Sequence, residues 1–172
     1  MLDRLRPRLE GKQAVLIGVG NPLRGDDGLG PVLVQELQGR VGATLIDAGD
    51  VPENYLGVVA SAGPDVVVIV DAAELGASPG DLALMEVDEL DGTSLSTHNA
   101  SLRLFVQVLL SEVQADVFVL GVQPASTGFG APISPMVGAT IDLLQRVFAG
   151  CWPTNARPAP ADEAGEDATQ IP

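Results

Sequence analysis

Short uninterrupted apolar runs alternate with amphipathic stretches along most of the chain. A continuous apolar run is typical of a strand buried on both faces, whereas apolar residues spaced three and four apart predict a helix with one buried face. The apolar runs occupy residues 14–19, 43–46, 65–70, 82–87 and 116–122. Helices are expected over residues 28–38, 102–113 and 135–148. This alternation predicts a three-layer α/β/α domain around a mostly parallel sheet of about five strands.

One of these strands is expected to run against the others. The turn Ser78-Pro79-Gly80 comes directly before the run from Leu82 to Val87. A parallel strand needs a crossover connection of a dozen or more residues, and too little chain is available here. We therefore expect this strand to pair antiparallel with a neighbour.

Two of the expected helix starts carry capping signals. Asp50, followed three residues later by Glu53, has the arrangement of a capping box, although that motif prefers Ser or Thr in the first place. Ser134 comes directly before Pro135, a residue suited to the first position of a helix. We expect the Ser134 side chain to cap the last helix.

The two ends of the chain differ in composition from the middle. Residues 1–12 are a charged lead-in in which Pro7 interrupts any long helix, and we expect a loosely held terminus. Residues 13–149 are expected to form one α/β domain. From Gly150 onward, prolines, alanines and acidic residues accumulate, so residues 150–172 are expected to form a disordered acidic tail.

Charge and cysteine content narrow the range of partners. The chain has 172 residues and a formal net charge of -14 at pH 7, which nucleic acids and anionic membrane surfaces would repel. No stretch is long and apolar enough to span a membrane, and the first residues lack the apolar segment of a secretory signal. Cys151 is the one cysteine, which excludes an internal disulfide and a cysteine-based zinc cluster. We expect a cytoplasmic protein that binds neither nucleic acid nor membrane.

The loop after the first predicted strand lies at the edge where open α/β sheets bind ligands. Its Gly18 and Gly20 are similar to the start of a dinucleotide-binding phosphate loop, but Leu23 stands where the third glycine would be. Asp26 and Asp27 lie just before the next helix. Their carboxylates would repel a phosphate and attract a metal ion or a cationic group.

Asp27, Asp71 and His98 are all predicted at this edge of the sheet. Asp71 ends the strongest predicted strand, and His98, the only histidine, comes just before a helix. Two carboxylates and one imidazole make a mixed oxygen and nitrogen site that suits Zn, Ni, Co or Mn and leaves coordination positions open. Two of these residues also have a simpler interpretation, Asp71 as a cap of nearby backbone N–H groups and His98 as a partly exposed polar residue.

Several motifs resemble those of the maturation endopeptidases of nickel-iron hydrogenases. The resemblance runs from about Ala14 to Phe148. The motifs shared with the whole family are Gly18-Val19-Gly20-Asn21, Asp26-Asp27-Gly28, Val70-Asp71-Ala72 and Thr97-His98-Asn99. The motifs of the formate-hydrogenlyase-type branch are Pro52-Glu53-Asn54, Ser78-Pro79-Gly80, Gly121-Val122-Gln123-Pro124 and Gly128-Phe129.

This resemblance implies a twisted five-stranded sheet and an activity that removes the C-terminal extension of a hydrogenase large-subunit precursor. It implies that Asp27, Asp71 and His98 meet the nickel carried by that substrate, that the same site is open to Ni, Zn or a similar divalent ion in the free enzyme, and that no organic cofactor is needed. It also associates Asp47 and its glycine-rich loop with substrate selection. Ala48 departs from the second glycine of many relatives and Asp81 from their usual Glu.

The sequence offers no identifiable nucleophile for a peptidase. It has no G-x-S-x-G elbow and no aspartic-protease Asp-Thr/Ser-Gly motif. We therefore expect a water polarised by the substrate's nickel, or by a neighbouring carboxylate such as Asp26, to attack the peptide bond. The residues expected to contact the substrate are Asn21, Asp26, Asp47 and Gly49.

A monomer acting on the precursor is the expected state, and two other functions stay open. One is a non-catalytic maturation chaperone that docks a metalloprotein through the same edge of the sheet. The other is a nucleotide-binding module, favoured only by Gly18, Gly20 and Asp47 as an acid for the ribose.

Overall fold

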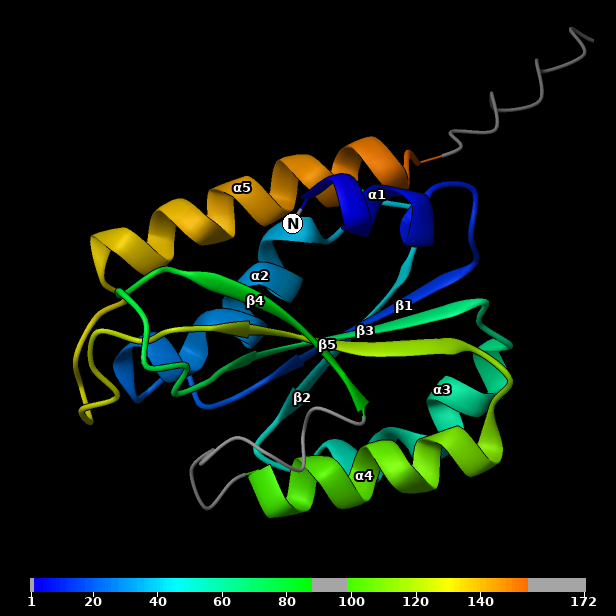
Figure 1. Cartoon of the computed structure of the whole chain (residues 1–172), viewed down its shortest axis with the longest axis horizontal. Helices are drawn as coiled ribbons and strands as arrows, with labels where there is room; N and C mark the ends of the chain where they lie inside the picture. Colours follow the sequence, from blue (N-terminus) through cyan, green and yellow to red (C-terminus); the bar gives the residue numbers. More distant parts are fainter. Residues whose placement is uncertain (1, 88–98, 155–172) are drawn as a thin grey trace, which may run out of the picture.

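The computed structural model describes residues 2–87 and 99–154, which contain a five-stranded sheet in the order β2-β1-β3-β5-β4 (Figure 1). The parallel strands are β1 (Ala14–Val19), β2 (Thr44–Gly49), β3 (Val66–Ala72) and β5 (Asp116–Val122). The edge strand β4 (Leu82–Glu86) pairs antiparallel with β5. Both the mostly parallel sheet and its one antiparallel strand are as predicted.

Helices cover both faces of the sheet and bury two apolar cores (Figure 1). One face is covered by α1 (Leu2–Leu9), α2 (Leu29–Leu37) and α5 (Pro135–Cys151), and the other by α3 (Leu56–Ala62) and α4 (Asn99–Glu112). Short 3-10 turns, η1 (Gly25–Gly28) and η2 (Pro52–Tyr55), lead into α2 and α3. Successive residues of β1 point to opposite cores, Leu16 toward α2 and α5 and Ile17 toward α3 and α4.

Close packing of α2 on β1 explains the glycines that begin the first loop. A Cβ atom on Gly18 would lie 2.3 Å from the carbonyl oxygen of Gly30, so both residues must lack side chains. Gly20 has a φ of 120°, and a Cβ there would collide with the backbone carbonyl oxygen of Asp27. These glycines therefore serve helix-on-strand packing and a tight loop, and they need no bound phosphate to account for them.

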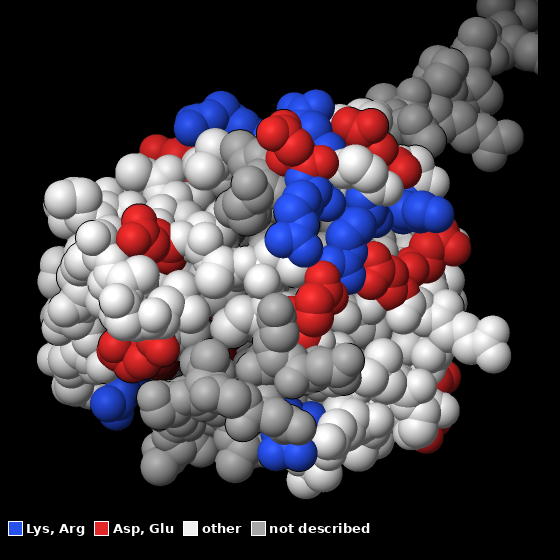
Figure 2. All heavy atoms as spheres, in the orientation of Figure 1, with Lys and Arg blue, Asp and Glu red and all other residues white. Residues whose placement is uncertain are grey.

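The amino-terminal segment is packed against the domain, so the expectation of a loosely held terminus is wrong for α1. Leu5 and Leu9 are fully buried against the sheet and α5. The guanidinium of Arg8 lies 4.1 Å from the centre of the Phe118 ring and forms ion pairs with Glu86 and Asp116. Basic and acidic side chains interleave on this part of the surface (Figure 2). Pro7 lies inside this short helix and removes the backbone N–H that would bond to the carbonyl of Asp3.

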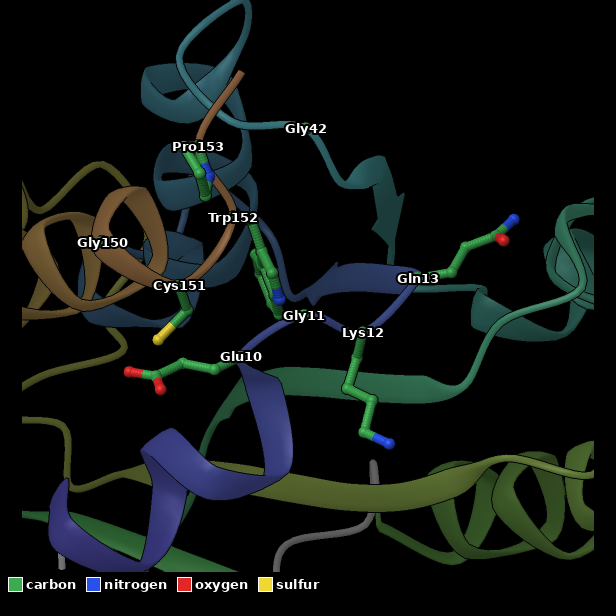
Figure 3. A pocket seen from close by; sticks show the side chains of 9 residues that line it. All are labelled: Glu10, Gly11, Lys12, Gln13, Gly42, Gly150, Cys151, Trp152 and Pro153. Atoms are coloured by element: carbon green, nitrogen blue, oxygen red, sulfur yellow. The ribbon is translucent and has the colours of Figure 1, made fainter. Parts of the chain in front are cut away.

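The carboxyl-terminal boundary lies later than predicted, because Cys151 and Trp152 belong to the core. The indole of Trp152 stacks on Phe148 with 4.8 Å between ring centres, and its Nε1 donates to the carbonyl oxygen of Leu9 at 3.0 Å. A hollow of about 500 Å³ opens beside this indole, between Glu10 and Lys12 of the amino-terminal segment and Cys151 (Figure 3). The rest of the predicted tail, residues 155–172, lies outside the described residues.

One of the two predicted helix caps is present. The Ser134 hydroxyl accepts from the Val137 N–H at 3.5 Å, and Pro135 opens α5 as expected. Asp50 caps nothing, because η2 begins at Pro52 with Val51 as its cap residue and no side-chain cap bond. Its carboxylate accepts a hydrogen bond from Asn21 instead. Across the described ranges, we find no helix whose length and apolarity would let it cross a bilayer.

Candidate functional site

Three acidic residues gather at the carboxyl ends of neighbouring strands. Asp27 lies in η1 after β1, Asp50 directly follows β2, and Asp71 is the next-to-last residue of β3. These three strands are parallel neighbours, so their carboxyl ends meet at one edge of the sheet. We call Asp27, Asp50 and Asp71 the acid cluster. The sequence predicted two of its members, whereas Asp50 was assigned to a helix cap.

Asn21 joins two members of the acid cluster. Its backbone N–H donates to Asp27 Oδ2 at 2.9 Å, and its side-chain Nδ2 donates to Asp50 Oδ2 at 3.0 Å. Its Oδ1 accepts from the Leu23 N–H at 3.0 Å, which closes the turn between Asn21 and η1. Asn21 therefore orients the carboxylates of Asp27 and Asp50. Each of these carboxylates keeps oxygen lone pairs for a further partner.

Asp71 is the buried member of the acid cluster, with only 5% of its surface exposed. Burial raises the pKa of its carboxyl to about 7, and the negative charges of Asp27 and Asp50 contribute to the increase against a hydrogen bond from the Ala72 N–H. Among the described residues, the neighbouring charges that act on Asp71 are thus themselves carboxylates. A cation bound between these groups would reverse the effect and favour the ionised form.

Asp26 points away from the acid cluster although it is the neighbour of Asp27. Its surface is 0% exposed, and its carboxylate accepts from the N–H groups of Ala125 at 2.8 Å, Ser126 at 3.2 Å and Ser134 at 2.6 Å. Burial alone would raise the pKa of Asp26, but these hydrogen bonds bring it below its ordinary value. This carboxylate is engaged in holding the loop between β5 and α5.

The geometry of Asp26 bears on its predicted contact with the substrate. A carboxylate that is closed off from solvent and already accepts three N–H groups is poorly placed to polarise a water or to meet another protein. The pattern Asp26-Asp27 could not show this, because adjacent residues of a 3-10 turn point in different directions.

Asp47 and Gly49 shape the end of β2 beside the first loop. The pairing of β1 with β2 shifts register between Gly18 and Val19, which leaves Ala48 as an extra residue whose methyl group is buried in the core. Gly49 adopts a left-handed φ of 53° and donates its N–H to Asp47 Oδ1 at 3.1 Å. Asp47 is exposed, and its predicted part in substrate selection stays a prediction.

His98 lies outside the described residues, in the segment 88–98 that precedes Asn99, the first residue of α4. Its predicted meeting with Asp27 and Asp71 therefore stays a prediction. Within residues 2–87 and 99–154, no three or more His, Cys, Asp and Glu side chains are arranged to hold a metal ion.

Gln123 is a buried polar residue whose part in the site the sequence did not reveal. Its Oε1 accepts from the Leu75 N–H at 2.7 Å, and its Nε2 donates to Glu74 Oε2 at 3.0 Å. These bonds fix the chain that leaves β3 after Asp71. The available signal was a polar residue directly after a strand, within the motif Gly121-Val122-Gln123-Pro124.

Comparisons with known proteins agree with one another. The model of the family described as hydrogenase maturation protease matches residues 31–149. The hydrogenase 3 maturation protease of Escherichia coli strain K12 is 30% identical over 144 residues, which cover 82% of this chain and 91% of that protein. A putative hydrogenase maturation protease of Methanocaldococcus jannaschii is 31% identical over 154 residues, 84% of this chain and 89% of that protein.

Solved structures of such proteases share the fold. The crystal structure of the NiFe hydrogenase maturation protease HycI from Thermococcus kodakarensis superimposes with a TM-score of 0.79 at 30% identity, covering 86% of this chain and 97% of that one. The crystal structure of a hydrogenase 3 maturation protease gives 0.72 at 29% identity, with 81% and 91% covered. The chain therefore belongs to the HycI-type family of nickel-iron hydrogenase maturation proteases and is a hydrogenase maturation endopeptidase.

Proposed function

We propose that this endopeptidase removes the C-terminal extension of a nickel-loaded hydrogenase large-subunit precursor and recognises the nickel through Asp27, Asp71 and His98. The observation that carries the proposal is the acid cluster, in which the buried carboxyl of Asp71 has Asp27 and Asp50 as its charged neighbours. Grouped carboxylates at a ligand-binding edge are destabilising until a cation joins them. A nickel ion held by the substrate would supply that cation, and the free site would also accept Ni, Zn or a similar divalent ion.

The chain's own residues have distinct parts in the proposed cut. Asn21 orients Asp27, and Gln123 fixes the chain beyond Asp71. Water attacks the scissile carbonyl carbon, the carbon–nitrogen bond breaks, and the new amine takes up a proton. With the nickel centre bound, Asp71 would be ionised and would hold the metal centre, so the proton that the amine takes up comes from the attacking water. His98 would supply the imidazole of the recognition site, and Asp47 with Gly49 would select the precursor.

Asp26 has a supporting part in this proposal. Its three hydrogen bonds position the loop between β5 and α5 beside η1, so it maintains the shape of the site from within the protein. No organic cofactor enters the proposal. The chain acts as a monomer on one precursor molecule.

The test is cleavage of a nickel-loaded precursor, followed by mass measurement of the product. Asp27→Asn, Asp71→Asn and His98→Gln should each slow the cut by about 100-fold or more, because each removes a group that meets the reacting centre. Asp142→Asn is the matched control, since Asp142 is exposed on α5. Equal cleavage of nickel-free and nickel-loaded precursor would contradict the proposal, as would an undiminished rate in Asp71→Asn.

A further inference from the structure

We propose that Leu23 and Phe129 form an apolar ledge that binds an apolar side chain of the precursor polypeptide next to its nickel centre. The inference rests on the proposed function and adds a second recognition element to it. The acid cluster would receive the metal centre, and the apolar ledge would receive the polypeptide beside it.

Both side chains of the apolar ledge are largely exposed to solvent. Phe129 is 80% exposed and Leu23 is 61% exposed. Neither side chain belongs to either apolar core, so core packing does not account for these two residues. Single exposed apolar residues are common on protein surfaces, and the case for this pair depends on where the backbone places it.

The backbone under the apolar ledge is firmly held. The Gly130 N–H donates to the carbonyl oxygen of Leu23 at 2.7 Å, which joins the two loops directly beside both side chains. Asp26 joins them again, because its own N–H donates to the Ser126 carbonyl at 3.0 Å and its carboxylate accepts from that loop. A surface that is already ordered loses little conformational entropy when a partner binds, so the apolar ledge is suited to docking.

The apolar ledge is continuous with the acid cluster through Asn21. Asn21 accepts from the Leu23 N–H and donates to both Asp27 and Asp50. A cationic centre bound among these carboxylates would therefore lie close to Leu23, within reach of the residues that flank that centre. The combination fits a polypeptide with an apolar residue close to a positively charged group, and the nickel-loaded precursor is the partner of that kind in the proposed function.

Other occupants of the apolar ledge fit less well. An anionic membrane surface would repel a chain of net charge -14, and two copies of this chain would repel each other for the same reason. Two side chains also offer only a small part of the roughly 800 Å² per partner that a standard stable interface buries. Such a patch suits a transient contact that the acid cluster completes.

The test separates binding of the precursor from its cleavage. Single-turnover cleavage of the nickel-loaded precursor is measured over a range of enzyme concentrations for wild type and for Leu23→Ala/Phe129→Ala. We expect the concentration for half-maximal rate to increase about tenfold or more in the double variant, and the maximal rate to stay within about twofold. Leu104→Ala is the matched control, because Leu104 is also 61% exposed but lies on α4, and it should behave as wild type.

Three results would overturn the proposal that the apolar ledge binds the precursor. They are an unchanged half-maximal concentration in the double variant, an equal increase in Leu104→Ala, and a wild-type dimer in sedimentation that Phe129→Ala dissociates. If wild type fails to cut the precursor, the proposed function fails and precursor binding by titration calorimetry decides on the ledge alone. Binding that the double variant loses would then support the ledge, and binding that it keeps would refute it.

Discussion

The two ends of the sheet differ in how their charged side chains are arranged, with opposite charges together at the amino end and like charges together at the carboxyl end. At the amino end, Arg8 lies between Glu86 and Asp116 and over the Phe118 ring, so opposite charges are paired within the molecule. At the carboxyl end, the charges of the described part of the chain that act on Asp71 are those of Asp27 and Asp50. The amino end therefore stabilises the fold by itself, whereas the carboxyl end holds unfavourable charge that a cation from outside would relieve.

This difference separates stability from function along one sheet. Paired charges and stacked rings tie α1 and the end of α5 to the core, far from the edge that carries the acid cluster (Figure 1). Like charges at a binding edge cost folding free energy, and such costs are common where a protein must bind a ligand. Substitutions at the two ends should therefore change stability in opposite directions.

The largest effect is expected at the amino end, for Trp152→Ala. This change removes the ring stacked on Phe148 and the hydrogen bond to Leu9, and leaves a cavity in the core. We expect the free energy of unfolding to fall by about 3–5 kcal/mol, measured by urea denaturation. Leu110→Ala, at an exposed site on α4, should change it by less than about 0.5 kcal/mol. Equal effects of the two variants would show that Trp152 does not anchor the chain end.

The opposite sign is expected at the carboxyl end, for Asp71→Asn. Folding raises the pKa of Asp71 from its ordinary 3.8 to about 7, so the folded protein keeps this proton where the unfolded chain has released it. The stability of wild type is therefore reduced progressively as pH rises from about 4 to 7, and this loss is complete above that range. Asn cannot ionise, so the variant should be more stable than wild type by about 2–4 kcal/mol at pH 8.

Urea denaturation of both proteins at pH 4, 6 and 8 checks this prediction. The advantage of Asp71→Asn should be small at pH 4, intermediate at pH 6 and greatest at pH 8. Asp142→Asn controls for loss of an exposed carboxylate and should show no such trend. If Asp71→Asn is less stable than wild type at pH 8, the like charges at the carboxyl end do not destabilise the fold, and the difference between the two ends of the sheet is contradicted.

The smallest effect is expected for Arg8→Met, which keeps an apolar side chain over Phe118 and removes the ion pairs. Glu86 and Asp116 are both partly exposed, so solvent screens their attraction to Arg8. We expect a loss of about 1 kcal/mol that shrinks as salt is added, measured by urea denaturation at low and high ionic strength. Arg4→Met, at an exposed site on the same helix, should have less effect. A loss that salt leaves unchanged would mean that packing, and not charge, holds α1.

The sequence alone determined the elements of this protein and its family. Apolar runs and helical stripes record local burial, so they located the five strands, the antiparallel β4 after its short turn, and the Ser134 cap of α5. The order of strands then predicted a binding edge where Asp27 and Asp71 would lie. The motifs around these residues were specific enough to identify a hydrogenase maturation endopeptidase.

Only the tertiary structure decided which partners those residues meet. Asp26 and Asp27 are adjacent in sequence, yet one is sealed among N–H groups more than ninety residues away and the other joins the acid cluster. Asp50 carries the signal of a helix cap but bonds to Asn21, and α1 appears as a loose terminus until Arg8 meets β4 and β5. Periodicity reports which face of an element is buried, whereas side-chain direction in a turn and pairing across long separations depend on the assembled fold.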